Sequence, residues 1–352
     1  IGEARILGKT HTVIEFLKDA SRHFIGHSPH DIEALYRRMT LFDFGKPGEV
    51  VYTGLALVEL ACWDLIGKAA SQPVYNLLGG CVRTSVPAYA NGWYTALETA
   101  REYADEAQRM VGLGFDAIKF DIDHSADEFQ HNVVNRGLSL GELDKMTALV
   151  AAVRDAVGDG INVCIDCHGI YSVRDVILLT KRLEPFNLMF LEDPVPPENI
   201  DVMAKVTAST SFPICTGEWV HRRDGFRRLI QEQACDMLQV DVSSTGGMLE
   251  AKKIADMADL YYMPFAAHNI TSPLGMVAAG HVCAAVQNHY TMELPCHSDQ
   301  VAWRWDLVLS DSELIVDGRF VLPSGLGLGV ELNEDVARRH LKEGYDFFGE
   351  GL

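Results

Sequence analysis

Residues 161–194 read INVCIDCHGIYSVRDVILLTKRLEPFNLMFLEDP, and this stretch decides the fold class. Two short apolar runs, VCI and LMFL, each end in an acid, Asp166 and Glu192. Between them, residues 173–183 have the apolar spacing of an amphipathic helix. A strand, a helix and a second strand in this order form the unit from which parallel sheets are built.

The same unit returns along the chain. Polar residues that end apolar runs stand at 166, 192, 218, 241, 268 and 293, at intervals of 26, 26, 23, 27 and 25. An interval of about 25 residues holds one strand, one helix and two short loops. Residues 86–90 and 117–121 read as two earlier strands, with a helix at 98–113 between them. Eight such strands favour a closed parallel barrel that gathers the polar groups at one end.

The segments around these strands complete the expected organisation. Residues 5–84 read as mostly helical, with a long apolar helix at 55–70. A polar insertion is expected at about 124–139, and a hairpin with an Asp-Gly turn within 313–321. A polar helix should begin near Asn333, and the tail should pack back on the N-terminal region. Further helices are expected at 173–183, 200–208, 225–233, 247–260 and 274–286.

Composition limits the partners of the chain. Its 352 residues carry a formal charge of −19, which disfavours nucleic acid and anionic membrane surfaces. We find no apolar stretch near the roughly 20 residues that cross a bilayer, and no signal peptide at the start, so we expect a cytoplasmic protein. Cys164 and Cys167 should face opposite sides of a strand, which disfavours zinc or disulfide chemistry. An anionic substrate would need a local positive charge, and a divalent metal ion supplies one.

Three acids form the candidate metal site. Asp166, Glu192 and Glu218 each end a short apolar run and so stand at the ends of adjacent expected strands, where their carboxylates should converge. Uncompensated convergence of three anions is costly, and a hard divalent cation removes that cost. Oxygen ligands suit octahedral Mg²⁺, so we predict one magnesium ion per subunit. The alternative is that each acid separately caps a helix or pairs with a lysine.

Other polar strand ends supply candidate catalytic groups. Asp241 and His268 end neighbouring strands, and a carboxylate beside an imidazole makes a competent general base. Lys119 either holds a substrate anion or the developing enolate oxygen, or forms a salt bridge with Asp121 or with an acid of the metal site. His168 either donates a proton to a leaving group or packs behind Asp166.

Glu293 is a further candidate at the last strand. Protonated, it could donate to an oxyanion, and ionised, it could pair with a cation. For several other side chains near the expected mouth, packing is favoured over a role in the pocket: His124, His297, Trp93 and Trp303-Arg304-Trp305.

Together these residues resemble the enolase superfamily, and within it the mandelate racemase subgroup. The resemblance rests on Lys119-x-Asp121, Asp166-x-His168-Gly169 and Leu191-Glu192-Asp193-Pro194. It continues through Thr216-Gly217-Glu218 and Asp241 to His268 and Glu293. The order of these motifs covers about 175 residues of the expected barrel.

The resemblance implies a modified TIM barrel, (β/α)₇β, with an α+β capping domain built from both chain ends. Residues 1–84 would form the N-terminal part of the cap with its initial strands missing, since Ile1–Ala4 resembles the end of the family's opening hairpin. Residues 85–302 would form the catalytic barrel, and residues 303–352 would pack back on the cap. Relatives commonly assemble as dimers or octamers, which implies a homo-oligomer.

The resemblance also implies a chemistry, removal of the proton α to a carboxylate. Asp166, Glu192 and Glu218 would bind Mg²⁺, and His268, oriented by Asp241, would take the proton. Glu293 and Lys119 would steady the developing negative charge.

Two departures from the family patterns bear on the reaction. Racemases of the subgroup usually carry a second lysine where Asp121 stands, and the Asp-x-His-Gly motif resembles that of sugar-acid dehydratases. An arginine usually follows that motif, whereas this chain has Ile170, which weakens an assignment to galactonate in particular. We therefore expect a hydro-lyase that dehydrates an aldonate or aldarate to a 2-keto-3-deoxy sugar acid. The alternatives are a racemase or epimerase of a 2-hydroxy acid, and a non-catalytic binding barrel.

Overall fold

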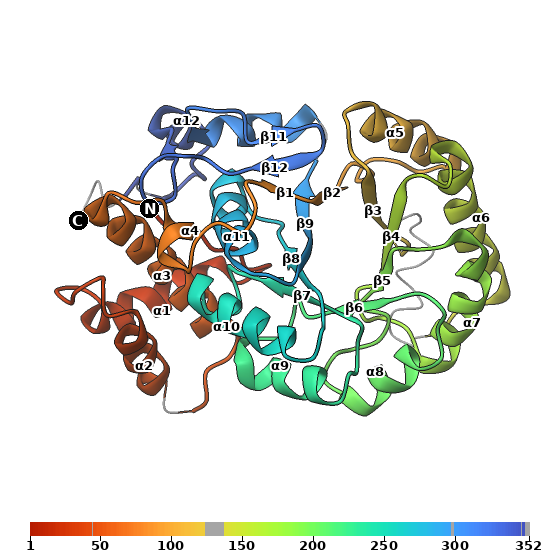
Figure 1. Ribbon diagram of the computed structural model, residues 1–352, viewed down its shortest axis with the longest axis horizontal. Helices are drawn as coiled ribbons and strands as arrows, with labels where there is room; N and C mark the ends of the chain where they lie inside the picture. Colours follow the sequence, from red (N-terminus) through yellow and green to blue (C-terminus); the bar gives the residue numbers. More distant parts are fainter. Residues whose placement is uncertain (44, 124–136, 297–298, 346, 349–352) are drawn as a thin grey trace.

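A closed barrel of eight parallel strands forms the centre of the molecule (Figure 1). The computed structural model describes residues 1–352 apart from 44, 124–136, 297–298, 346 and 349–352. The strands pair in sequence order, and the last of them pairs with the first. They are β2 (Ala88–Asn91), β3 (Ala117–Asp121), β4 (Asn162–Asp166), β5 (Phe190–Glu192), β6 (Ile214–Thr216), β7 (Met237–Asp241), β8 (Phe265–His268) and β9 (His289–Pro295).

One α-helix or more follows each strand but the last, which confirms the predicted (β/α)₇β barrel. These helices are α5 (Ala100–Gly112), α6 (Leu140–Val157), α7 (Val173–Leu183), α8 (Ile200–Thr207), α9 (Arg222–Gln231), α10 (Met248–Asp259) and α11 (Pro273–Ala285). Helix α6 is missing from the expectations above. It begins at a capping box in which Ser139 and Glu142 satisfy each other's backbone N–H groups.

The first expected strand, residues 86–90, is two strands in different sheets. Pro87 separates β1 (Ser85–Val86) from β2, because proline has no N–H to donate to a ladder. Strand β1 pairs antiparallel with β12 (Arg319–Val321) outside the barrel. Strand β9 also differs from the expectation, since it runs two residues past Glu293 and so places that acid within the strand.

Alternate residues of the strands face the two sides of the barrel wall. Cys164 packs in the inner cluster, whereas Cys167 packs in the larger cluster between strands and helices, as their spacing predicts. The inner cluster consists of Tyr89, Ala117, Cys164, Phe190, Cys215, Met237 and Ala266. The lower half of the barrel is therefore a packed core, and polar side chains occupy the end above it.

The N-terminal helices lie beside the barrel, to the left in Figure 1. They are α1 (Thr10–Ala20), α2 (Ile32–Phe42), α3 (Glu49–Ala70) and the short α4 (Val74–Leu77). Helix α3 starts six residues before the expected position 55, and by length and composition alone it could cross a membrane, contrary to our reading of the sequence. In the fold, 67% of its apolar window is buried, as in the core helix of a globular protein.

A carboxylate from α3 joins the N-terminal helices to the barrel. The side chain of Glu59 accepts hydrogen bonds from the backbone N–H groups of Met248 (2.9 Å) and Leu249 (3.0 Å) at the start of α10. A negative charge at a helix N-terminus is favourable. A Cβ atom at Gly247 would lie 2.3 Å from the Glu59 carboxylate, so this contact requires glycine there.

The C-terminal segment contacts both the barrel and the N-terminal helices. The expected hairpin is present as β11 (Ile315–Val316) and β12, and α12 (Glu334–Arg339) begins after Asn333 as predicted. Two further short strands, β10 (Val308–Leu309) and β13 (Glu331–Leu332), pair with each other. His281 of α11 accepts from the backbone N–H of Tyr75 (3.2 Å) and lies 3.0 Å from the carbonyl oxygen of Leu328.

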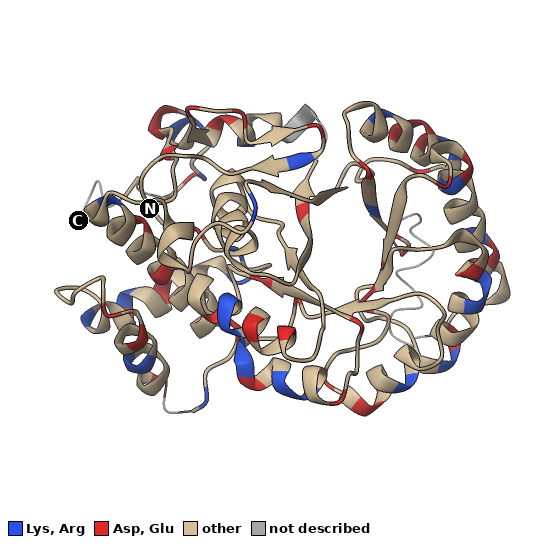
Figure 2. Ribbon diagram, in the orientation of Figure 1, with Lys and Arg blue, Asp and Glu red and all other residues tan. Residues whose placement is uncertain are grey.

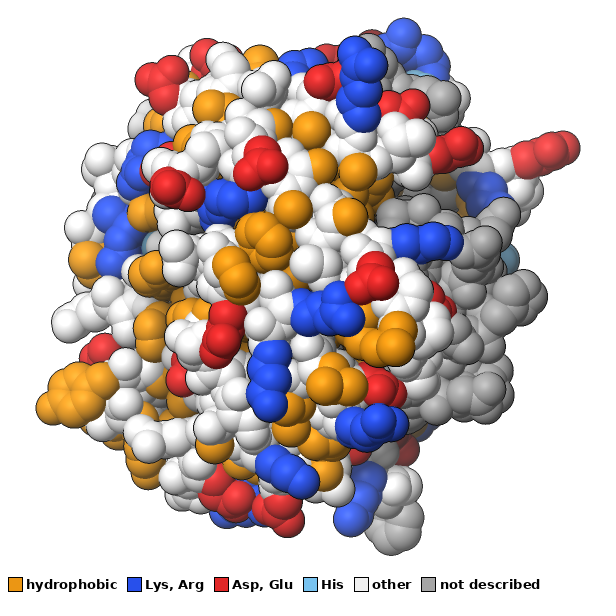
Figure 3. Space-filling model, turned by 90° about the vertical axis from the view of Figure 1, so that its right-hand side faces the viewer, with side chains coloured by type: hydrophobic (Ala, Val, Ile, Leu, Met, Phe, Trp, Pro, Cys, Tyr) orange, Lys and Arg blue, Asp and Glu red, His pale blue; other side chains and the backbone are white. Residues whose placement is uncertain are grey.

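Basic and acidic residues are interspersed on most of the outer helices (Figure 2). On the face that Figure 3 shows, acidic and basic groups alternate with exposed apolar side chains. Acidic residues also stand at the strand ends inside the ring of helices, where the candidate site lies (Figure 2).

Candidate active site

The strand register places the polar residues at the strand ends next to one another at the same height along the barrel axis. Asp121 pairs with Asp166 across β3 and β4, and Asp166 pairs with Glu192 across β4 and β5. On the other side of the barrel, Asp241 pairs with His268 across β7 and β8. Glu218 lies two residues beyond the end of β6.

Lys119 lies at the centre of the acid cluster. Its Nζ atom is 3.0 Å from Asp166 Oδ2, 2.7 Å from Glu192 Oε2 and 3.3 Å from Glu293 Oε1. Burial alone would lower the pKa of Lys119, but Glu192 and Glu293 raise it well above its usual value. The ammonium group therefore stays charged and offsets part of the repulsion among the acids. Of the two expected arrangements, the contacts show a salt bridge, and its partners are Asp166, Glu192 and Glu293.

Asp241 and His268 form a buried pair. His268 Nδ1 lies 2.7 Å from Asp241 Oδ2, while its Nε2 lies 2.7 Å from Glu218 Oε2. The other oxygen of Asp241 accepts from the backbone N–H and the hydroxyl of Ser243, both at 2.7 Å. Burial disfavours the charged imidazole, but Glu293 and Glu218 raise the pKa of His268 well above its usual value.

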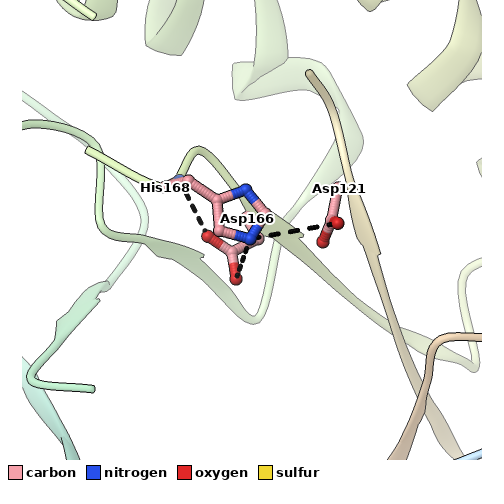
Figure 4. Close-up of side chains that lie close together, drawn as sticks. All are labelled: Asp121, Asp166 and His168. Carbon is pink, nitrogen blue, oxygen red and sulfur yellow. Dashed lines mark hydrogen bonds and ion pairs between the residues drawn. The ribbon is translucent and has the colours of Figure 1, made fainter. Parts of the chain in front are cut away.

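His168 belongs to a second pair, with Asp123, on the opposite side. Its Nδ1 is 3.2 Å from Asp123 Oδ2, and its Nε2 is 3.9 Å from both Asp121 Oδ2 and Asp166 Oδ2. Asp121, Asp166 and His168 each offer a ligand atom within 4.8 Å of the others, as Figure 4 shows for their side chains. The negative charge of Asp166 raises the pKa of His168 to about 12, and burial raises the pKa of Asp121 to about 7.

Glu293 accepts hydrogen bonds on both oxygens. The side-chain amide of Asn91 donates to Oε1, and the backbone N–H of Asn269 donates to Oε2 at 3.0 Å. Lys119 Nζ lies 3.3 Å from Oε1 as well, so both oxygens of Glu293 are held in place by neighbouring donors.

Several residues at this end of the barrel were not singled out as candidates in the sequence. They are Asp123 beside His168, Asn91 beside Glu293, and Arg5, which donates to the carbonyl oxygen of Ile270 at 2.6 Å. For Asp123 a signal existed, because its position two residues after Asp121 continues the inward alternation of β3. Arg5 is distant in sequence, and no local pattern points to it.

Of the candidates for which the sequence favoured packing, some are packed in the structure and one contacts the loop after His268. Trp93 is buried against Tyr94, Tyr103 and Phe120, and Trp303 stacks on His340 at 3.7 Å. Arg304, in contrast, donates to the carbonyl oxygen of Thr271 (3.0 Å), three residues after His268. His124 and His297 lie outside the described residues.

A parallel eight-stranded barrel with an acidic mouth and N-terminal helices beside it defines a class of enzyme folds, that of the enolase superfamily. The enolase C-terminal domain-like model matches residues 102–336, and the mandelate racemase/muconate lactonizing enzyme N-terminal domain matches residues 1–79. The chain belongs to the mandelate racemase/muconate lactonizing enzyme family.

Similar proteins of this family include named dehydratases. The D-xylonate dehydratase of Haloferax volcanii is 38% identical over 99% of this chain and 84% of its own length. The D-galactonate dehydratase of Ralstonia pickettii is 31% identical over 98% of this chain and 88% of its own. These names agree with the expectation of a hydro-lyase, since a dehydratase removes water.

The solved structures agree with the fold. A mandelate racemase/muconate lactonizing enzyme-like protein from Rubrobacter xylanophilus superposes with a TM-score of 0.90 at 39% identity, covering 99% of this chain and 92% of its own. A protein from Salmonella enterica that is described as a putative dehydratase also reaches 0.90, at 30% identity, over 97% of this chain and 89% of its own.

Members of the enolase superfamily generally bind Mg²⁺, and the residues at this mouth suit that ion. They present carboxylate oxygens, which Mg²⁺ prefers. Glu192 is fully buried, and its Oε1 has no hydrogen-bond partner among the described residues. Burial raises the pKa of Glu192 well above its usual value, and the negative charge of Asp166 raises it further. A buried carboxylate oxygen without a partner is costly, and a cation removes that cost.

Proposed function

We propose that this protein is a Mg²⁺-dependent sugar-acid dehydratase that converts an aldonate or aldarate to a 2-keto-3-deoxy acid. The observation that carries the proposal is a pair of histidine–carboxylate dyads, one just after β4 and one at the end of β8, strands that have three strands between them in either direction around the barrel. Dehydration of a hydroxy acid needs one base and one acid, and the two dyads supply them. The dehydratase names of the relatives support the same reaction.

Asp166, Glu192 and Glu218 would hold the magnesium ion. When bound, the ion supplies Lewis-acid chemistry that lowers the cost of negative charge on a carboxylate losing its α-proton. Asp121 and His168 share contacts with Asp166 and lie beside these ligands.

His268 is the proposed base. Its Nδ1 faces Asp241, so Nε2 is the nitrogen that accepts the C2 proton. The electrons of the C2–H bond then move into the C1–C2 bond, giving an enediolate. Lys119, held among Asp166, Glu192 and Glu293, provides a fixed positive charge near the developing anion.

His168 is the proposed acid. Asp166 raises its pKa to about 12, so the imidazole carries its proton at neutral pH. As the C3–O bond breaks, this proton passes to the leaving hydroxyl, which departs as water. The resulting enol, with its double bond between C2 and C3, becomes the 2-keto acid by gaining a proton at C3 and losing the proton of its C2 hydroxyl.

A racemase by the same enediolate is the alternative. It needs a second base opposite His268. Lys119 is poorly suited because the ordinary pKa of lysine, 10.5, is far above the 6.5 of histidine, and three carboxylates contact its ammonium group. Asp121 is a weak base for a carbon acid, although burial raises its pKa to about 7. No contact among the described residues favours racemisation over dehydration.

The direct test is a set of sugar mono- and diacids incubated with the protein and Mg²⁺ and scored by release of 2-keto acid. Turnover of one or more acids is expected, with loss of activity when the metal is chelated. Exchange of the C2 proton in D₂O without loss of water would replace the proposal by a racemase. Stabilisation by Mg²⁺ with no reaction on any acid would indicate a binding barrel.

Two variants separate the roles of the histidines. His268→Asn should abolish C2 proton exchange and leave Mg²⁺ affinity within a few-fold of wild type. His168→Asn should suppress dehydration by about 100-fold while C2 exchange continues. If His168→Asn dehydrates normally, the acid lies elsewhere in the site.

A further inference from the structure

Two arginines from opposite ends of the chain meet the loop that follows His268. Arg5 donates to the carbonyl oxygen of Ile270 at 2.6 Å, and Arg304 donates to that of Thr271 at 3.0 Å. The two acceptors are consecutive residues, and they lie two and three positions after the proposed base. Each hydrogen bond uses one guanidinium N–H of five, so both side chains keep donors for another ligand.

The two guanidinium groups are close enough to affect each other and the catalytic acids. Burial lowers the pKa of Arg5, Arg304 lowers it further, and Asp241, Glu293 and Glu218 act in the opposite direction. Arg5 therefore lies within electrostatic range of the mouth. In a protein with a formal charge of −19, two fixed positive charges beside an acidic site also favour entry of an anion.

The same loop carries a further donor without a partner. Asn269 is 2% exposed, and its side-chain oxygen accepts from the hydroxyl of Thr271 at 2.5 Å. Its side-chain nitrogen is buried and has no partner among the described residues. The two guanidinium groups have N–H donors beyond those that bind the loop, and the Asn269 amide nitrogen has no acceptor among the described residues, so the complementary ligand is rich in acceptor oxygens.

We propose that Arg5 and Arg304 determine specificity by holding the hydroxyl groups of the sugar acid beyond C3. The proposal rests on the proposed function, because it takes His268 as the base and the acid cluster as the place of the reacting carboxylate. The cluster lies at β4–β6, whereas the arginines lie beyond β8, next to the N-terminal segment. A substrate with its carboxylate at the cluster and C2 at His268 extends its remaining carbons toward that segment.

The test compares two substrates in wild type, Arg5→Met and Arg304→Met. The first is D-xylonate, the acid named for a relative, and the second is the four-carbon acid with the same configuration at C2 and C3. Each variant should lower kcat/KM for the longer acid by about 10- to 100-fold, mainly through KM. For the shorter acid the loss should stay below about threefold, because the hydroxyl that the arginines would hold is absent or displaced.

Arg83→Met is the matched control. Arg83 also comes from outside the barrel strands and donates to the backbone carbonyls of Val286 (2.6 Å) and Gln287 (3.1 Å). These carbonyls lie before β9, at the end of the barrel away from the mouth. This variant should show a similar loss of thermal stability and an unchanged ratio of kcat/KM for the two acids. Arg5→Lys, which keeps the charge but loses the planar fork, should recover part of the discrimination.

Equal losses for both acids in Arg5→Met and Arg304→Met would overturn the proposal, since they would show an effect through the loop or through charge alone. Calorimetric binding of the two acids to His268→Asn, with and without each arginine variant, gives the same comparison without turnover. If wild type dehydrates no sugar acid but this binding difference is present, the proposed function fails and the arginine assignment stands. If wild type is active and the binding difference is absent, the reverse holds.

Discussion

The two histidine–carboxylate pairs at the mouth of the barrel are built differently. In the pair on β8, the His268 side chain is 6% exposed and lies 2.7 Å from a carboxylate that Ser243 holds in place. In the pair just after β4, the His168 side chain is 35% exposed and its distance to Asp123 is 3.2 Å. His168 also adopts a φ of 46°, in the left-handed region that non-glycine residues rarely occupy.

The difference matches two chemical tasks. A base that removes a weakly acidic carbon proton benefits from a fixed tautomer and a rigid position, which burial and a short hydrogen bond provide. An acid that releases its proton to a departing hydroxyl must reach the substrate and the water that forms. The left-handed backbone at His168 is a conformation of the kind that proteins keep at functional sites.

Among the substitutions that compare the two pairs, Asp241→Asn should lower kcat the most. An amide in place of the carboxylate can present its N–H₂ to Nδ1 and so stabilise the tautomer that carries its proton on Nε2. Nε2 then cannot accept the C2 proton, and kcat should fall by about 1,000-fold. Measurement of both dehydration and C2 exchange should show equal losses, whereas a loss of dehydration alone would place Asp241 outside the base pair.

Asp123→Asn should have a smaller effect, about 10-fold on dehydration. His168 keeps its interaction with Asp166, which is the main cause of its raised pKa, so the variant loses orientation more than charge. Exchange of the C2 proton should stay near the wild-type rate. An effect as large as that of Asp241→Asn would show that the two pairs are equally rigid in function.

Ser243→Ala should have the mildest catalytic effect. It removes the hydroxyl that donates to Asp241 at 2.7 Å, while the backbone N–H groups of Ser243 (2.7 Å) and Ser244 (3.0 Å) continue to hold the carboxylate. The loss of one hydrogen bond among three should lower kcat by about threefold to 10-fold. Kinetics at saturating substrate measure this loss, and a fall beyond about 100-fold would mean that the hydroxyl does more than support Asp241.

His281 shows what burial does to a histidine pKa without a carboxylate partner, because hydrogen bonds to backbone groups hold its ring. Burial lowers its pKa from 6.5 to about 4, so the folded protein favours the neutral ring. Its contribution to stability is complete above pH 6.5 and is lost as the pH falls toward 4, by roughly 3 kcal/mol in total. Urea unfolding of wild type and His281→Gln between pH 7 and pH 5 should show the wild-type advantage shrinking with acid. A constant difference would contradict the pKa direction.

Much of the fold was predictable because its signal is local and repeated. The acids at 166, 192 and 241 and His268 stand at or next to strand ends as the apolar runs predict, since each run of a parallel barrel is bounded by its own loops. The division of residues 86–90 at Pro87 was missed, because a strand run gives no indication of which sheet it joins. Helix α6 was missed although its capping box, Ser139 to Glu142, is readable in the sequence.

Site residues that stand at the end of a single strand could be predicted from the sequence. Contacts between segments that are distant in sequence could not. Lys119 and Glu293 were expected near the mouth, but the three-way salt bridge of Lys119 depends on the barrel closing. Arg5 reaches Ile270 across 265 positions, a separation that no periodic pattern encodes. Contacts of this kind follow from tertiary packing alone.

The order of translation limits when these long-range contacts can form. When translation has reached His268, the proposed metal ligands and both members of the Asp241–His268 pair have already been synthesised. Glu3 and Arg5 can then dock on Ser272 and Ile270 as soon as those residues emerge, yet Thr271 waits for Arg304 before its carbonyl is held. The contact of Thr271 therefore forms only after Arg304, 33 residues further along the chain, has been translated, and a product truncated between Glu293 and Arg304 would carry the proposed catalytic groups without that contact.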